Sequence, residues 1–338
     1  MNFTSSTLSA AVRTLRTSLL ITTMASILAC LSCAGQGAAS LVNERSSSSS
    51  SGYTWTEVVR SAPWSKSYNF EMFTVKDQLW VFHFDGNWYS TDGSTWTKSD
   101  LPNSIKNLAF LDYVYFKNAM FGLGHFEGNI EKFSFKPEIY KTNDFRTWQT
   151  ISTNSNLPRR YFYHPFVFND KIWIVGGEDE TKQFSDVWNS SDGVTWTKVG
   201  DNLSFGPRSH SQVVQLGGKL YLLNNDVWVS SNGIDWEQIA SEIIKGEQVF
   251  GYKAVVFGNR IWLLGCNRAG HFASQVLVSG DGKTWETIAA PWSPRGAVAA
   301  AVFADKIYMT GGKYGGTPDQ PNFIYSNDVW TLSASDPK

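Results

Sequence analysis

The chain has 338 residues, a formal net charge of −1 and only 17% charged residues. It contains no block of clustered Lys and Arg, which phosphate neutralisation would need, so its composition argues against nucleic acid as a partner. Aromatic residues make up 15% of the chain, and the 15 Trp recur along one continuous stretch, residues 53–332. We expect this stretch to be a single domain and the protein to be a monomer.

Residues 1–34 are typical of an export signal. Arg13 and Arg16 precede an apolar stretch from Leu19 to Leu31, and small residues follow it. Export signals have this order of basic, apolar and small-residue regions. A transmembrane anchor is the alternative, although the stretch is short and rich in Thr for a membrane span.

Two cysteines of this segment, Cys30 and Cys33, stand where a bacterial lipoprotein signal carries its lipid-modified cysteine. The resemblance to such signals makes either residue a lipidation site, and ordinary cleavage near Ala34 or Ala39 is the alternative. We therefore expect an exported protein that is either secreted or held at a cell surface or in the periplasm by a lipid. The lipid would be its only membrane contact.

Residues 35–52 include a run of serines from Ser46 to Ser51. Such a run cannot bury apolar surface, so we expect a flexible tether. After processing, Cys266 is the only remaining cysteine, which excludes a disulfide framework within the domain.

Five segments repeat one pattern: an aromatic or aliphatic residue, a polar turn, and a Trp at constant spacing. The turn is usually Asp-Gly or Asn-Gly, which tolerate the positive φ angles of tight hairpins. The segments are residues 88–96, 140–148, 188–196, 228–236 and 277–285. Two further strands precede each hairpin. Six units of four strands, called a to d in chain order, predict an all-β fold, a six-bladed β-propeller with four antiparallel strands per blade.

The two ends of the domain complement each other. The last unit has a strand c, from Asn327 to Leu332, but no strand d follows it. The missing strand lies at the other end, where residues 53–57 resemble residues 194–198. We expect the N-terminal strand to close the last blade, with residues 333–338 as a C-terminal tail. A seven-bladed ring would need another strand b, which the sequence lacks.

Length variation is confined to the connections between strands b and c. In a propeller these connections share one face with the d–a crossovers, and insertions restricted to one face mark the working face of a repeat protein. The insertions in units 2, 3, 5 and 6 predict a raised rim on this face.

Some repeat residues resemble known propeller families. The glycine pairs Gly176-Gly177 and Gly311-Gly312 and the segment from Pro207 to His210 are similar to kelch repeats and to the central domain of galactose oxidase. The Asp-Gly turns resemble the Asp-box of sialidases but are one residue shorter. The resemblance implies a propeller and leaves the function open, because kelch rings include oxidases, sugar mutarotases and binding scaffolds. Around Cys266 there is no motif for the cysteine-crosslinked tyrosine of the copper oxidase.

Cations precede strand a in most units and are candidate ligand-binding residues. A collar of such cations at the channel mouth would suit a carboxylate or a sulfate. The alternative is that the arginines brace neighbouring blades through backbone carbonyls. These cations are Lys66, Lys106, Arg160, Arg208 and Arg295.

Other candidates lie in matching loops and in the insertions. Trp64 and Trp292 occur in similar fragments of neighbouring blades and are predicted either to stack on sugar rings or to pack within loops. Glu178, Arg268 and Tyr314 lie in long b–c loops, where an acid pair with arginines would be the minimum for glycoside chemistry.

Asp92, Asp192 and Asp281 are expected to bind the turn backbone, because Asn232 occupies the same place in its repeat. The five histidines lack metal-ligand spacing, so no metal and no cofactor are expected.

Three functions remain open. The first is a non-catalytic surface propeller that binds a glycan or a protein on its b–c face. The second is a sugar-active enzyme, either a kelch-type mutarotase or a glycosidase- or sialidase-like hydrolase. The third is a purely structural role. A deep pocket with converging Arg, Glu and Tyr would favour the enzyme, and a shallow aromatic face would favour binding.

Overall fold

The computed structural model describes residues 52–68, 70–99, 112–129, 132–145, 147–317 and 320–334. The predicted export signal, both lipidation candidates and most of the predicted tether lie outside these residues. The described residues form β-strands and turns and contain no helix. Among them there is accordingly no helix long and apolar enough to cross a membrane.

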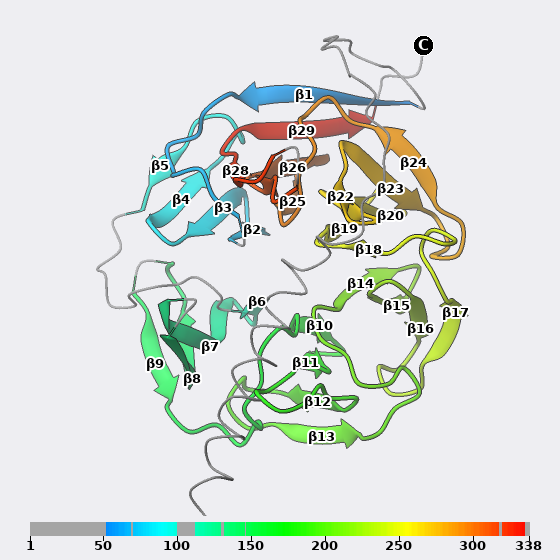
Figure 1. Cartoon of the computed structure of the whole chain (residues 1–338). Helices are drawn as coiled ribbons and strands as arrows, with labels where there is room; N and C mark the ends of the chain where they lie inside the picture. Colours follow the sequence, from blue (N-terminus) through cyan, green and yellow to red (C-terminus); the bar gives the residue numbers. More distant parts are fainter. Residues whose placement is uncertain are drawn as a thin grey trace, which may run out of the picture.

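Within the described residues, six antiparallel sheets have four strands each, and we number them sheets 1 to 6. Sheet 1 consists of β2 (Glu71–Val75), β3 (Gln78–His83), β4 (Gly86–Ser90) and β5 (Thr97–Lys98). Sheet 2 consists of β6 (Asp112–Phe116), β7 (Ala119–Asn129), β8 (Lys132–Thr142) and β9 (Gln149–Ser152). Sheet 3 consists of β10 (Phe166–Phe168), β11 (Lys171–Val175), β12 (Val187–Ser190) and β13 (Thr197–Gly200). Sheet 4 consists of β14 (Gln212–Leu216), β15 (Lys219–Leu223), β16 (Val227–Ser230) and β17 (Glu237–Ala240). Sheet 5 consists of β19 (Lys253–Phe257), β20 (Arg260–Leu264), β23 (Gln275–Ser279) and β24 (Glu286–Ala289). Sheet 6 consists of β25 (Ala299–Phe303), β26 (Lys306–Thr310), β29 (Val329–Ala334) and β1 (Tyr53–Val59). Figure 1 shows the sheets around a common centre, with β2, β6, β10, β14, β19 and β25 innermost.

The N-terminal strand β1 is the outer strand of the last sheet, where it pairs antiparallel with β29. This agrees with the strand assignment made from the sequence. The β-ladder extends beyond Leu332, the expected end of the last strand, because Tyr53 pairs with Ala334 and Thr54 with Ser333. Residues 333 and 334 therefore belong to the sheet and not to a tail.

The c–d turns repeat one hydrogen-bond pattern, as predicted for their Asp and Asn residues. In sheet 1 the Asp92 carboxylate accepts hydrogen bonds from the backbone N–H groups of Ser94 and Thr95, both at 2.7 Å. Gly93 has a φ of +75°, and a Cβ there would lie 2.1 Å from the Tyr308 ring of the neighbouring sheet. The turn therefore needs glycine both for its backbone conformation and for close packing. Asp192, Asn232 and Asp281 accept the equivalent bonds in sheets 3, 4 and 5.

The apolar core lies between neighbouring sheets. Leu79 of sheet 1 and Ala299 of sheet 6 share one cluster, and Leu223 of sheet 4 and Ile261 of sheet 5 share another. Each sheet therefore completes its core with the next one, as expected for stacked repeats. Burying one such Leu or Ile contributes about 1.5–3 kcal/mol.

The b–c connections carry additional structure in sheets 2, 3, 5 and 6, as the length variation predicted. In sheet 2 the strands β7 and β8 are 11 residues long. In sheet 5 the hairpin β21 (Asn267–Arg268) and β22 (His271–Phe272) pairs with β18 (Val249–Phe250). In sheet 6 the insertion forms β27 (Lys313–Tyr314) and β28 (Ile324–Tyr325). We call the side of the molecule that carries these connections the insertion face.

Candidate functional site

A polar cavity lies at the centre of the molecule, where the innermost strands begin. Its volume is about 130 Å³, and its lining residues are Glu71, Asp112, Tyr113, His164, Pro165, Gln212, Val213, Lys253 and Ala254. Glu71, Asp112, Gln212 and Lys253 are the first residues of β2, β6, β14 and β19. His164 stands just before β10, the innermost strand of sheet 3.

An ion pair crosses this cavity. The Lys253 ammonium donates a hydrogen bond of 2.7 Å to the Glu71 carboxylate. Lys253 belongs to sheet 5 and Glu71 to sheet 1, and β25 of sheet 6 contacts the innermost strands of both. The first residue of β25 is Ala299, so the strand that contacts both of these strands begins without a polar side chain.

Asp112 is a second carboxyl group in the cavity. Desolvation raises the pKa of Asp112 well above its usual value, and the nearby negative charge of Glu71 raises it further, while Lys253 lowers it. Asp112 therefore holds its proton to higher pH than an exposed Asp does, and it can donate a hydrogen bond as a neutral acid.

The other polar groups differ in how far they are already engaged. Desolvation, with the positive charges of Lys253 and His210, lowers the pKa of His164 to about 3, so its imidazole is neutral at physiological pH. Both polar atoms of the Gln212 side chain already have a partner within the fold: the amide nitrogen donates to the Tyr252 carbonyl at 2.6 Å, and the amide oxygen accepts from the Ala254 N–H at 3.0 Å. A ligand would therefore meet Asp112, His164 and the Glu71–Lys253 pair.

The three predicted collar arginines make the contacts of braces. Arg160 is 1% exposed and binds Asp186 with two nitrogens, at 2.7 and 3.0 Å, and the Gly176 carbonyl at 2.9 Å. Arg208 pairs in the same way with Asp226, and Arg295 with Asp328. These guanidinium groups are occupied by carboxylates of their own sheets. They therefore brace one sheet through carboxylates, and the alternative expected from the sequence, a brace between neighbouring blades through backbone carbonyls, differs from this in both partner and place.

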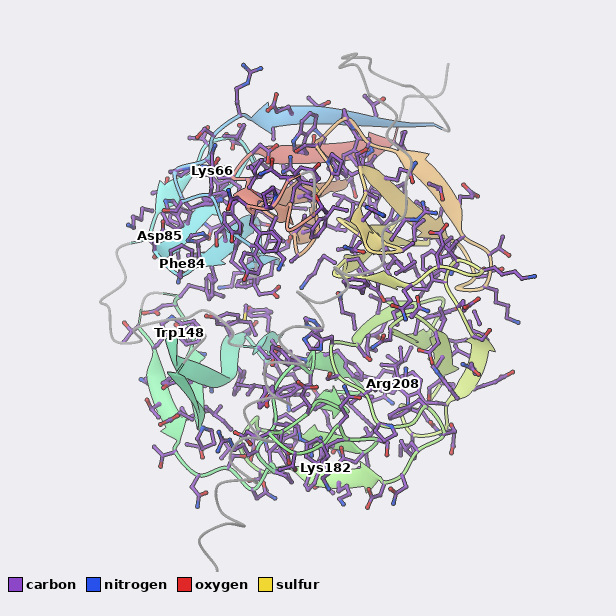
Figure 2. The ribbon with its side chains drawn as sticks, viewed as in Figure 1. Lys66, Phe84, Asp85, Trp148, Lys182 and Arg208 are labelled. Carbon is purple, nitrogen blue, oxygen red and sulfur yellow. The ribbon has the colours of Figure 1, made fainter. Side chains whose placement is uncertain are left out.

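The predicted collar cations also do not gather at one place. Lys66 is exposed and precedes β2, whereas Arg208 precedes β14. Figure 2 shows Lys66 and Arg208 over sheets on opposite sides of the centre. Lys106 lies outside the described residues.

Trp64 and Trp292 are core residues, with exposed fractions of 1% and 3%. The Trp64 ring makes an edge contact with Trp96 at 4.9 Å, and the Trp292 ring with Trp55 at 4.2 Å. Neither ring offers a face for a sugar in this structure, so their contacts are those of loop packing.

The loop candidates lie in separate insertions. Glu178 is 3% exposed and accepts hydrogen bonds from the Ser209 hydroxyl at 2.7 Å and the Gln183 amide at 3.3 Å. Arg268 binds both oxygens of Glu247, at 2.9 and 3.1 Å. Tyr314 contacts the Phe272 ring at 6.4 Å. None of the three lines the central cavity.

The described residues contain no group of three or more His, Cys, Asp and Glu that could hold a metal ion. His83 pairs with Asp85 at 2.5 Å, and Asp85 also accepts the Ser65 hydroxyl at 2.6 Å. Figure 2 shows Asp85 beside Phe84 at sheet 1. The second ring nitrogen of His83 is buried without a partner, so this Ser–Asp–His order differs from that of a nucleophilic triad.

The repeat pattern by itself did not single out the cavity residues. Their signal is the residue at the head of each strand a, which is Glu71, Asp112, His164, Gln212 and Lys253 in five units and Ala299 in the sixth. The signal in the sequence is therefore a polar residue at the start of a largely apolar strand, at the same position of the repeat in all units except the last.

Comparisons with known proteins support the fold. The model of the family described as "DUF6242 beta propeller domain" matches residues 141–252. A solved structure titled "Structure of YjhT" is similar with a TM-score of 0.66 and 12% sequence identity, and the match covers 82% of this chain and 97% of that chain. No curated protein matches. In all, 500 chains of solved structures match, and such a widely used fold does not specify one function. The chain is thus similar to proteins with a β-propeller fold.

Proposed function

We propose that this chain is a ligand-binding propeller whose six sheets are six blades of a kelch-like ring. It takes a small polyhydroxylated ligand, such as one sugar unit of a glycan, into the central cavity. The observation that carries this proposal is the convergence of Asp112, His164 and the Glu71–Lys253 pair on one cavity. A hollow with a few converging polar groups and perturbed pKa values is the usual form of a small-molecule site.

The chemistry of the lining suits hydroxyl groups. A sugar hydroxyl both donates and accepts, and the cavity offers a carboxylate acceptor, an ammonium donor, a neutral imidazole and a carboxyl group whose pKa is raised by desolvation. The volume of about 130 Å³ is below the 300–1,000 Å³ typical of drug-sized ligands, so one small unit fits better than an oligomer.

A tethered, exported position would agree with this role. We propose that residues 1–34 direct export, that Cys30 or Cys33 carries a lipid if the chain is anchored, and that residues 35–52 hold the propeller away from the membrane. The cavity lies at the heads of the inner strands, on the insertion face, where a glycan outside the cell could reach it.

The test is a calorimetric and thermal-shift screen of the purified protein against monosaccharides, amino sugars and sugar alcohols. Ligand binding to the native state raises the melting temperature by mass action. We expect a hit whose affinity falls at least tenfold in Lys253→Met and is unchanged in Lys219→Met. Lys219 is exposed at the a–b turn of sheet 4, at the other end of the inner strands. No shift with any ligand, or equal losses in both variants, would contradict the proposal.

A second candidate, a sugar-active enzyme, is favoured by one observation. Asp112, with its raised pKa, is a proton donor beside the Glu71 carboxylate, and such unequal acid pairs occur in acid–base catalysis. Turnover of a bound sugar, followed by NMR of its anomers or by release of a chromogenic aglycone, would distinguish the two. Turnover lost in Asp112→Asn with binding retained would identify the enzyme.

A further inference from the structure

A second site lies at the insertion of sheet 6, around Lys313 of β27. Lys313 is 4% exposed, and its ammonium lies 4.4 Å from the centre of the Tyr68 ring and 4.8 Å from that of the Phe323 ring. Tyr68 in turn stacks on Tyr325, with ring centres 5.5 Å apart and planes at 13°. No carboxylate of the described residues forms an ion pair with Lys313, and no hydrogen-bond acceptor of those residues lies on its ammonium.

In sheet 3 the position equivalent to Lys313 is held by Glu178, whose charged group has hydrogen-bond partners. Glu178 and Lys313 both follow a glycine pair, and both exchange backbone hydrogen bonds of 2.9–3.0 Å with the preceding crossover, at Tyr161 and Gly296. Glu178 receives hydrogen bonds from Ser209 and Gln183. The corresponding places in sheet 6 are held by Tyr68, whose ring lies under the Lys313 ammonium, and by Tyr325, which pairs with Lys313 in the β-ladder. The hydrogen-bond partners that Glu178 has in sheet 3 are therefore replaced by aromatic residues in sheet 6.

A buried cation without an anion is costly, because rings replace only part of its lost hydration. Burial lowers the pKa of Lys313 to about 8, so most of the molecules still carry the charge at neutral pH. Phe323 is half-buried and lies between two exposed residues, Asn322 and Ile324, so this wall of the site stands at the surface.

We propose that Lys313, with Tyr68, Phe323 and Tyr325, is a binding site for a carboxylate-bearing ligand, whose carboxylate pairs with the ammonium and whose carbon skeleton lies against the aromatic rings. The site is separate from the central cavity and does not depend on its ligand. The carboxylate can belong to a sugar acid or to a simple cyclic acid, and the test separates these sources.

The test is calorimetry of the purified protein with glucuronate, cyclohexanecarboxylate and glucose. We expect the carboxylates to bind and a loss of about tenfold or more in Lys313→Met, as for the loss of a charged hydrogen bond. Preference for glucuronate identifies a sugar acid, and equal affinity a simple acid. Lys306→Met is the matched control, because Lys306 is exposed at the start of β26 in the same sheet. Lys253→Met reports binding at the central cavity and should leave this site unchanged.

Further measurements distinguish the loss of the Lys313 charge from a loss of folding. Lys313→Arg keeps the charge and should retain binding within a few-fold, and circular dichroism establishes that the variants fold. Affinity should fall between pH 7 and pH 9 as Lys313 loses its proton. Carboxylate binding that is unaffected by Lys313→Met, or no carboxylate binding by the unmodified protein at millimolar concentration, would overturn the proposal.

Discussion

Lys253 of β19 and Glu71 of β2 join two sheets that are not neighbours, through a hydrogen bond of 2.7 Å across the central cavity. Their side chains are 20% and 28% exposed, so the pair is only partly hydrated. The same interaction thus links sheets 1 and 5 and forms part of the candidate site.

Removing only the lysine of this pair should lower the free energy of unfolding more than removing both charged groups. Lys253→Met leaves the Glu71 carboxylate beside Asp112 without a cation, and we expect a loss of about 1–3 kcal/mol in the free energy of unfolding. The double variant Lys253→Met/Glu71→Gln should recover part of this loss. Urea unfolding of the four proteins in a double-mutant cycle measures the coupling. A coupling free energy near zero would contradict a direct interaction.

Asp112→Asn should stabilise the protein at neutral pH. Because desolvation raises the pKa of Asp112 in the folded state, the native protein binds more protons at this site than the unfolded chain, and stability falls as pH rises above about 4. The amide removes this penalty. We expect the variant to exceed the wild type in stability at pH 8 and to match it more closely near pH 3–4. Urea unfolding at both pH values checks the sign, and a variant less stable at pH 8 would refute it.

Arg160→Met should be strongly destabilising without being a specific binding defect. It leaves Asp186, which is 5% exposed, without its cation, and breaking a buried pair in this way costs about 3–5 kcal/mol. The matched control is Arg159→Gln next to it, whose pair with Glu180 lies at the surface and should contribute about 0–1 kcal/mol. Thermal unfolding compares the two. If Arg160→Met kept full stability but lost ligand affinity, Arg160 would be a ligand-binding residue, as in the predicted collar, and its role as a structural brace would be refuted.

The c–d turns should tolerate Asn but not Ala. Asp192→Asn keeps the acceptor for the Val194 and Thr195 N–H groups, and Asn232 already does this in sheet 4. Asp192→Ala removes both bonds, and we expect a loss of about 1 kcal/mol. Chemical denaturation of both variants tests this. Equal losses would show that the charge of Asp192, and not its acceptor geometry, holds the turn.

Deleting residues 53–59 should expose the β29 edge of the last sheet. Because β1 satisfies this edge along its length, the shortened protein should lose stability and self-associate through the open strand. Size-exclusion chromatography and light scattering follow the association. A shortened protein that remains monomeric and keeps its melting temperature would show that β1 is dispensable.

The repeat could be found in the sequence because it rests on local chemistry. Asp-Gly turns, alternating strands and a Trp at fixed spacing act within one hairpin, so they indicate strand order and turn chemistry. They also indicate the pairing of residues 53–57 with the end of the chain, in a strand that the structure extends to Tyr53–Val59. The b–c insertions were visible for the same reason, since they are differences in length between otherwise regular units.

The sites could not be found in this way, because they depend on which residues meet across the ring. The sequence places Arg160 before a strand, but only the fold puts Asp186 within 2.7 Å of it and turns a candidate ligand-binding cation into a brace. Likewise Glu71 and Lys253 are far apart in the chain, and only the arrangement of the sheets around a common centre brings them together. The sequence by itself determined the repeating β-structure, because hairpins are stabilised locally. The tertiary structure alone decided which charges are paired and which face a cavity, because the energy of a buried charge depends on the partners that distant strands provide.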